Sequence, residues 1–109
     1  MAREIARGEI RLYPFSHPDK QRPVLVLTRD TSIRRLTRAT VAPITSTLRG
    51  VPSEVALDEA DGMKSRCAVN LHNLVTVSQQ LLGKRLAQLS SQRMDEICAA
   101  LRFSLGCDV

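Results

Sequence analysis

Two short segments of this sequence carry side chains suited to phosphodiester chemistry. Residues 21–28 carry the guanidinium of Arg22 at their second position, and residues 39–46 end in the hydroxyls of Thr45 and Ser46. An arginine fork matches phosphate oxygens in a bidentate geometry, and a hydroxyl adds a second donor. RNA can be cut by such groups without a metal ion, because its own 2′-OH attacks the adjacent phosphorus. The protein then has to align the reacting oxygens and stabilise the charge of a phosphorane.

Two histidines could move protons near neutral pH. His17 lies in a polar loop, and His72 stands in a turn beside Asn73. Each candidate also has an ordinary structural interpretation: Arg22 as a surface arginine, the hydroxyls as turn residues, and the histidines as solvated loop residues. The residues alone therefore predict a basic, β-rich domain that could bind and cleave RNA.

The composition is that of a small, basic, globular domain. The 109 residues suit one domain, and the formal net charge is +5. RNA, DNA and an acidic protein would all qualify as partners of such a chain, and a merely soluble basic surface is the alternative. The few aromatic residues argue against recognition dominated by base stacking. Because we find neither a membrane-spanning run nor a signal peptide, we expect a cytosolic protein.

The usual motifs of metal and nucleophile catalysis are absent from the sequence. Cys67, Cys98 and Cys107 are widely spaced, which is typical of neither a disulfide framework nor a zinc site. Cys98 falls on an apolar helical face, so we expect a small buried hydrophobe there. There is no Gly-rich phosphate loop, no His-Glu-x-x-His and no Gly-x-Ser-x-Gly. We therefore predict a function without a metal or cofactor.

The apolar pattern predicts several short strands. Residues 23–28 contain an unbroken Val-Leu-Val-Leu run, which predicts a strand buried on both faces. Further strands are expected at 8–13, 39–44, 54–57, 65–69, 74–77 and 84–89. Short strands at close spacing, without a βαβ rhythm, favour a small antiparallel barrel or a strongly curved sheet. If the strands at 23–28 and 39–44 pair, Arg22 and Thr45 lie near one end of the sheet.

One clear helix is predicted at the C-terminal end. Ser90 is a good N-cap, and Gly106 can end the helix. The apolar residues spaced for its buried face are Met94, Ile97, Cys98, Leu101 and Leu105. Earlier in the chain, residues 29–38 carry four arginines and predict a helical turn with Ile33 and Leu36 facing inward. These arginines are either a solvated connector or a surface that contacts phosphates.

Five segments, in this order, resemble the MazF/PemK family of toxin endoribonucleases. They are Arg7-Gly8-Glu9-Ile10, Gln21-Arg22-Pro23-Val24-Leu25-Val26-Leu27, Val41-Ala42-Pro43-Ile44-Thr45-Ser46, Gly50-Val51-Pro52 followed by Glu54-Val55, and Gly83-Lys84-Arg85-Leu86 before the terminal helix. The resemblance covers nearly the whole length and implies a single toxin domain, 1–109. It implies a mainly β fold, a small SH3-like barrel with a C-terminal helix, that works as a homodimer.

The resemblance also implies an activity and a partner. The activity is metal-independent, sequence-selective cleavage of single-stranded RNA, which leaves a 2′,3′-cyclic phosphate and a 5′-OH. The partner is a cognate antitoxin whose tail covers the site. On matching positions, Arg22 would bind the scissile phosphate and assist proton transfer, and Thr45 would contact phosphate. The other residues implied to bind RNA or support the site are His17, Gln21, Ser46, Arg49, His72 and Asn73.

The sequence departs from the family where an acidic residue is expected. Leu71-His72-Asn73 stands where the MazF branch has Ala-Asp-Gln, and Arg66-Cys67-Ala68 stands where the PemK branch has Arg-Cys-Asp. Neither alignment restores a carboxylate, so we expect Arg22 and Thr45 to carry the chemistry and the histidine and asparagine to hold bases or phosphate. The alternatives are a toxin of the same fold that binds DNA gyrase without cutting RNA, and an inactive relative kept as a binding domain.

Overall fold

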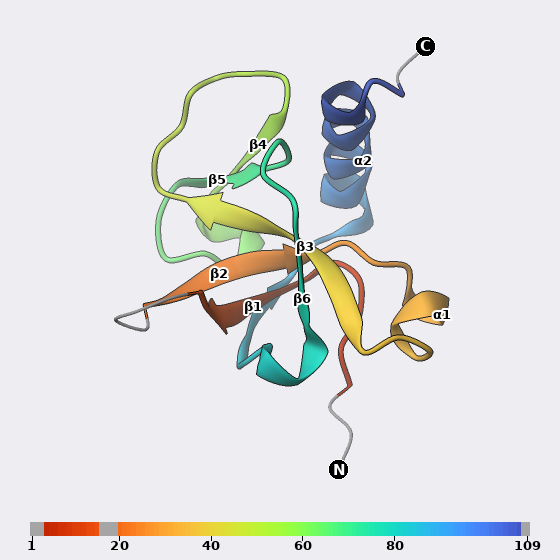
Figure 1. The fold of residues 1–109 in the computed structure, drawn as a ribbon. Helices are drawn as coiled ribbons and strands as arrows, with labels where there is room; N and C mark the ends of the chain where they lie inside the picture. The colour runs from red at the N-terminus through yellow and green to blue at the C-terminus, as the bar shows by residue number, and fades with distance from the viewer. Residues whose placement is uncertain (1–3, 16–19, 108–109) are drawn as a thin grey trace.

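Seven strands curl into one antiparallel sheet in the computed structural model, which describes residues 4–15 and 20–107 (Figure 1). The strands are β1 (Glu9–Pro14), β2 (Gln21–Val26), β3 (Arg38–Thr45), β4 (Glu54–Leu57), β5 (Cys67–Asn70), β6 (Val75–Ser78) and β7 (Arg85–Gln88). Their order is β4-β5-β3-β2-β1-β7, and β6 pairs with β3. The predicted curved antiparallel sheet is therefore confirmed.

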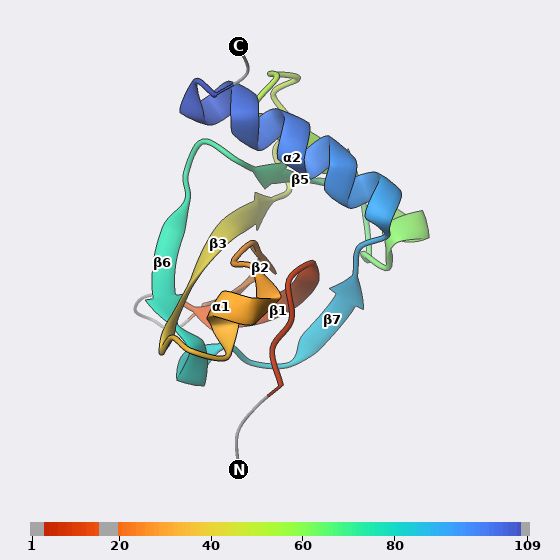
Figure 2. The same ribbon diagram turned by 90° about the vertical axis from the view of Figure 1, so that its right-hand side faces the viewer.

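The helical elements are short apart from the last one. They are α1 (Asp30–Ile33), the 3-10 turns η1 (Glu59–Asp61) and η2 (Gln79–Leu81), and α2 (Ser91–Leu105). Figure 2 shows α2 lying across the half of the sheet that contains β5. Within residues 4–15 and 20–107, no helix has the length and apolar character needed to cross a bilayer.

The central strand β2 is buried on both faces, as its sequence predicts. Val24 and Val26 belong to one apolar cluster, and Leu25 belongs to the other, together with Leu27 just after the strand. Successive side chains of a strand point to opposite faces, so one strand feeds both clusters. The first cluster includes Ile33, Val41, Val77 and Leu82, and the second includes Ile10, Ile44, Leu57, Val69 and Ile97.

The ends of α2 are those that the sequence predicts. The Ser90 hydroxyl accepts the backbone N–H of Arg93 at 3.1 Å, and Gly106 ends the helix in the left-handed region at φ 74°. Its buried face is narrower than predicted. Leu105 is 62% exposed, because the last turn of α2 extends past β5 (Figure 2). The prediction of a buried Cys98 is also wrong: it is half-buried, and its Sγ lies 3.2 Å from Nη2 of Arg7.

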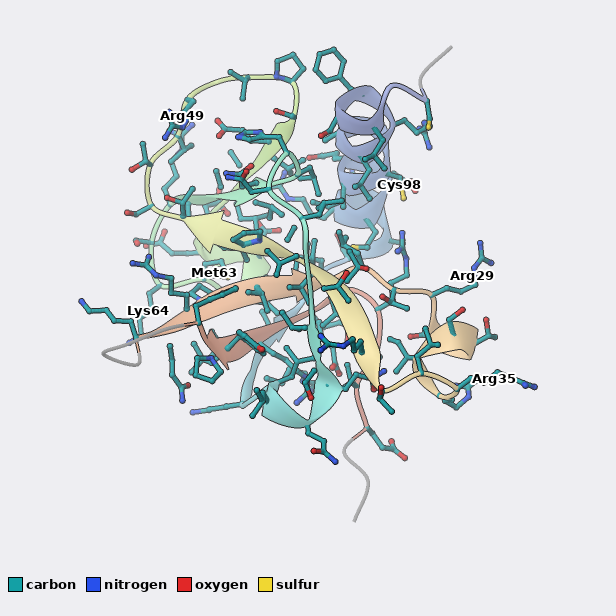
Figure 3. The ribbon with its side chains drawn as sticks, in the orientation of Figure 1. Arg29, Arg35, Arg49, Met63, Lys64 and Cys98 are labelled. Carbon is teal, nitrogen blue, oxygen red and sulfur yellow. The ribbon has the colours of Figure 1, made fainter. Side chains whose placement is uncertain are left out.

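The arginine-rich segment 29–38 contains the single turn α1, and its arginines lie before and after that turn. Ile33 is buried as predicted, but Leu36 is 55% exposed, so the prediction for Leu36 is wrong. The regular helix ends at Ile33, so its inward face does not continue to the next apolar residue. Figure 3 shows Arg29 and Arg35 extending outward from this turn.

Candidate functional site

A groove opens where β3 changes its pairing partner. Val24 of β2 pairs with Pro43, whereas Ile44 and Thr45 pair with β5. The ladder between β2 and β3 therefore ends at Val24 and Pro43, within β2, and beyond Pro43 strand β3 pairs with β5 instead. The groove at this place has a volume of about 740 Å³.

Arg22 and Thr45 both line this groove. Arg22 lies two residues before Val24 on β2, and Thr45 lies two residues after Pro43, the partner of Val24 on β3, so both stand beside the point where the two strands part. Arg22 is exposed, and Thr45 is half-buried. The Thr45 Oγ1 accepts the backbone N–H of Thr47 at 3.1 Å, which leaves its own proton free for donation into the groove. The structure thus brings together the guanidinium and the hydroxyl that the sequence singled out.

The groove combines an apolar floor with a cationic rim. Leu12, Pro23 and Ile44 contribute apolar surface. Five cationic side chains surround it: Lys20, Arg22, Lys64, Lys84 and Arg85. None of the lining residues in the described part of the chain is acidic. Such a rim attracts an anionic chain. In Figure 3, Lys64 lies on the opposite side of the molecule from Arg29 and Arg35, so the arginine-rich turn is separate from the groove.

The other predicted residues divide into two groups. Gln21 and Ser46 line the groove beside Arg22 and Thr45. Arg49, His72 and Asn73 do not line it. The Nδ1 of His72 lies 2.6 Å from the buried Ser53 hydroxyl, so this ring is fastened to the loop before β4. The predicted role of His17 lies outside the described residues.

Sequence reasoning missed several cations of the rim. Lys84 and Arg85 lie in one of the segments that resemble the family. That resemblance was the only feature of the sequence that could have pointed to them. Nothing in the sequence analysis pointed to Lys64. These residues come together because the beginning of β7 lies close to the loop after η1. No local sequence pattern predicts this contact.

An ion pair anchors the wall that carries Lys64. Asp61 accepts from Arg93 through both oxygens, Oδ1 from Nε at 2.9 Å and Oδ2 from Nη2 at 3.1 Å. Hydrogen bonding to this guanidinium holds the pKa of Asp61 below its ordinary value. The next residues, Gly62 to Ser65, line the groove, so the pair ties the groove wall to α2.

Cys67, at the base of the groove, is buried, and this burial raises the pKa of its thiol. The group is therefore a neutral thiol at neutral pH. Across residues 4–15 and 20–107, no group of three or more His, Cys, Asp or Glu side chains is arranged to hold a metal ion. The polar groups that line the groove include guanidinium, hydroxyl and ammonium groups, which can bind an anion.

Comparison with known proteins identifies the family. A model described as "PemK-like, MazF-like toxin of type II toxin-antitoxin system" matches residues 6–105. The chain belongs to this family. It is 45% identical over 103 residues to the probable endoribonuclease MazF5 of Mycobacterium tuberculosis, covering 94% of each chain. It is 39% identical over 102 residues to the probable endoribonuclease MazF2 of the same species, covering 93% of this chain and 98% of the relative.

Solved structures of this toxin family have the same fold. The Mycobacterium tuberculosis toxin MazF-mt6 superimposes with a TM-score of 0.84 at 33% identity, covering 93% of this chain and 99% of that chain. A mycobacterial endoribonuclease in complex with its cognate antitoxin matches with a TM-score of 0.87, covering 96% and 98% of the two chains. The latter is 24% identical and supports the fold alone.

Proposed function

We propose that this chain is a single-domain, sequence-selective endoribonuclease toxin that cuts single-stranded RNA without a metal ion. Its membership of the PemK/MazF-like family and the endoribonuclease names of its relatives support the activity. The observation that supports the proposed mechanism is the cationic groove that Arg22 and Thr45 both line. The proposed place of action is the cytoplasm.

In the proposed reaction, the RNA backbone crosses the groove with one phosphate between Arg22 and Thr45. The guanidinium binds two phosphate oxygens, and the hydroxyl donates a further hydrogen bond. The 2′-OH attacks phosphorus and loses its proton to solvent, while the bond from phosphorus to the 5′ oxygen breaks and that oxygen takes up a proton. The products are a 2′,3′-cyclic phosphate and a 5′-OH. Arg22 assists by hydrogen bonding to the oxygens on which charge develops.

The shape of the groove favours single-stranded RNA. The apolar surface of Leu12, Pro23 and Ile44 suits an unstacked base, and a base in a duplex cannot be splayed out in this way without unpairing. The remaining cations of the rim would hold the flanking phosphates. Contacts to single-stranded phosphates release counterions, so cleavage should weaken as the salt concentration rises.

The partners of this proposal are single-stranded RNA, a cognate antitoxin and a second copy of the chain. Membership of a family described as the toxin of a type II toxin-antitoxin system supports the second of these. An antitoxin tail with carboxylates would compete with RNA for the same cationic rim.

The test is RNA cleavage by purified variants in EDTA. We expect Arg22→Ala to slow cleavage by roughly 10²- to 10³-fold, as for the loss of a donor to a developing anion. Thr45→Ala should slow it by about tenfold, the value of one hydrogen bond from a neutral donor to a charged phosphate, which is weaker than the two bonds of a guanidinium. Arg35→Ala is the matched control, since this arginine lies away from the groove, and it should keep full activity.

Two results would contradict the proposal. Full activity in both groove variants would remove Arg22 and Thr45 from the mechanism, and products ending in a 3′-hydroxyl would exclude attack by the 2′-OH. No cleavage by the parent chain, together with gyrase binding, would favour the alternative toxin of the same fold.

A further inference from the structure

A buried carboxylate on β1 is joined to one cation of the groove. Glu9 is 5% exposed. Its Oε1 accepts hydrogen bonds from Nε of Arg11 at 2.8 Å and from the backbone N–H of Ala6 at 3.1 Å. Its Oε2 lies 3.4 Å from Nη1 of Arg85, whose side chain is 56% exposed and lines the groove. Glu9 therefore connects the interior of the sheet to the groove rim.

The inner half of this cluster is held in place by further hydrogen bonds. The side chain of Arg11 is 10% exposed. Its Nη1 donates to the carbonyl oxygen of Gly83 at 2.9 Å, and its Nη2 donates to that of Glu4 at 3.0 Å. These two bonds fix the position of Arg11, and Arg11 in turn holds Oε1 of Glu9. The other carboxylate oxygen, Oε2, is the one that faces Arg85.

A β-bulge turns Arg85 toward this carboxylate. Ile10 pairs with Ala87, but Arg11 pairs with Arg85, so Leu86 is the extra residue. In a regular ladder Arg11 would face Leu86, and Arg85 would point to the other side of the sheet. Bulges re-aim side chains and are common beside active sites. Here the bulge brings Arg85 to the face of the sheet that carries Glu9.

We propose that Glu9 is a positioning residue that holds the Arg85 guanidinium ready to bind an RNA phosphate next to the scissile one. One carboxylate stands against the two guanidinium groups of Arg11 and Arg85, so the cluster keeps one positive charge for the RNA. Ordering a long side chain before the ligand arrives reduces the entropy lost on binding. This inference rests on the proposed RNA substrate and adds a carboxylate that acts through Arg85, without touching the reacting atoms.

A double-mutant cycle on RNA cleavage tests this coupling. We expect Arg85→Gln to raise KM by roughly tenfold, the value of one charge-assisted hydrogen bond. Glu9→Gln should raise KM by about three- to tenfold through lost ordering, with kcat within about twofold. The double variant should be no worse than Arg85→Gln alone. Lys84→Gln is the matched control: Lys84 lines the same groove, and its effect on KM should multiply with that of Glu9→Gln.

A second measurement uses the unaltered chain, since loss of Glu9 also leaves Arg11 unpaired. In the free protein, ¹⁵N relaxation of the arginine Nε–H groups should show Arg85 more ordered than the exposed Arg34. Equal mobility of these two side chains would overturn the inference, and so would multiplicative effects of the Glu9 and Arg85 variants on KM. If either of these results is found while cleavage still depends on Arg22, only the role of Glu9 is refuted and the proposed nuclease activity is not affected. If cleavage does not depend on Arg22, the proposed nuclease mechanism itself is refuted.

Discussion

Replacing Asp61 by asparagine is expected to destabilise the fold and loosen one wall of the groove. The carboxylate accepts two hydrogen bonds from Arg93, and its Oδ2 also accepts the backbone N–H of Asp58 at 3.0 Å. The side chain of Asp61 is 9% exposed. An asparagine offers one acceptor oxygen and no charge, so it cannot bind the guanidinium fork in the same way.

The expected loss of stability in Asp61→Asn can be derived from these contacts. A hydrogen bond to a charged group contributes about 1.5–3 kcal/mol, and two bonds to one guanidinium do not add fully. Arg93 is 27% exposed and keeps its bond to Glu96, which limits the loss. We expect a decrease of about 2 kcal/mol in the free energy of unfolding, or about 10 °C in Tm for a domain of this size. RNA binding should weaken as well, because Lys64 stands on the loosened wall.

The stabilisation from the Asp61–Arg93 pair is expected to depend on pH. Arg93 depresses the pKa of Asp61 in the folded chain below the unfolded value of about 3.9. The stabilisation is therefore fully present above that unfolded value and is lost as the pH falls through the folded pKa. The difference in stability between the parent chain and Asp61→Asn should be constant from about pH 7 to 5 and should close in stronger acid.

Urea unfolding of the two proteins at each pH measures this difference. Glu96→Gln is the matched control, since Glu96 pairs with the same arginine at a site that is 47% exposed. Its cost should stay below about 1 kcal/mol. A stability difference between the parent chain and Asp61→Asn that persists in strong acid would contradict this prediction, because the stabilisation would then not come from the ionised carboxylate.

Two further predictions concern the frame of the groove. Gly62→Ala should cost about 1–2 kcal/mol in urea unfolding, because Gly62 has a φ of 93° and a Cβ there would lie 3.1 Å from that of Ala87; an unchanged midpoint would contradict this. Ile97→Ala should cost about 2–5 kcal/mol, because Ile97 is fully buried between α2 and the sheet. Calorimetry measures the latter, and a Tm shift under about 5 °C would be too small for the predicted cavity.

Much of the fold could be predicted from local patterns. The uninterrupted apolar run predicted a strand buried on both faces, and the cap residues Ser90 and Gly106 predicted the ends of α2. The failures share a cause. Leu36, Cys98 and Leu105 have the right spacing for an inward face, but spacing does not say how far the neighbouring elements extend. A helical face is buried only where another element covers it.

For the candidate site, the chemical types and the family resemblance could be predicted from the sequence: a guanidinium at the start of one strand and hydroxyls at the end of another. That these strands pair, so that Arg22 and Thr45 line one groove, depends on the register between distant segments. The remaining features of the groove follow from tertiary contacts. The partner change of β3 opens the groove, the approach of β7 adds Lys84 and Arg85, and one bulge turns Arg85 toward Glu9. The reason is physical: side-chain periodicity is a local property, whereas strand pairing and sheet curvature arise from contacts between residues far apart in the chain.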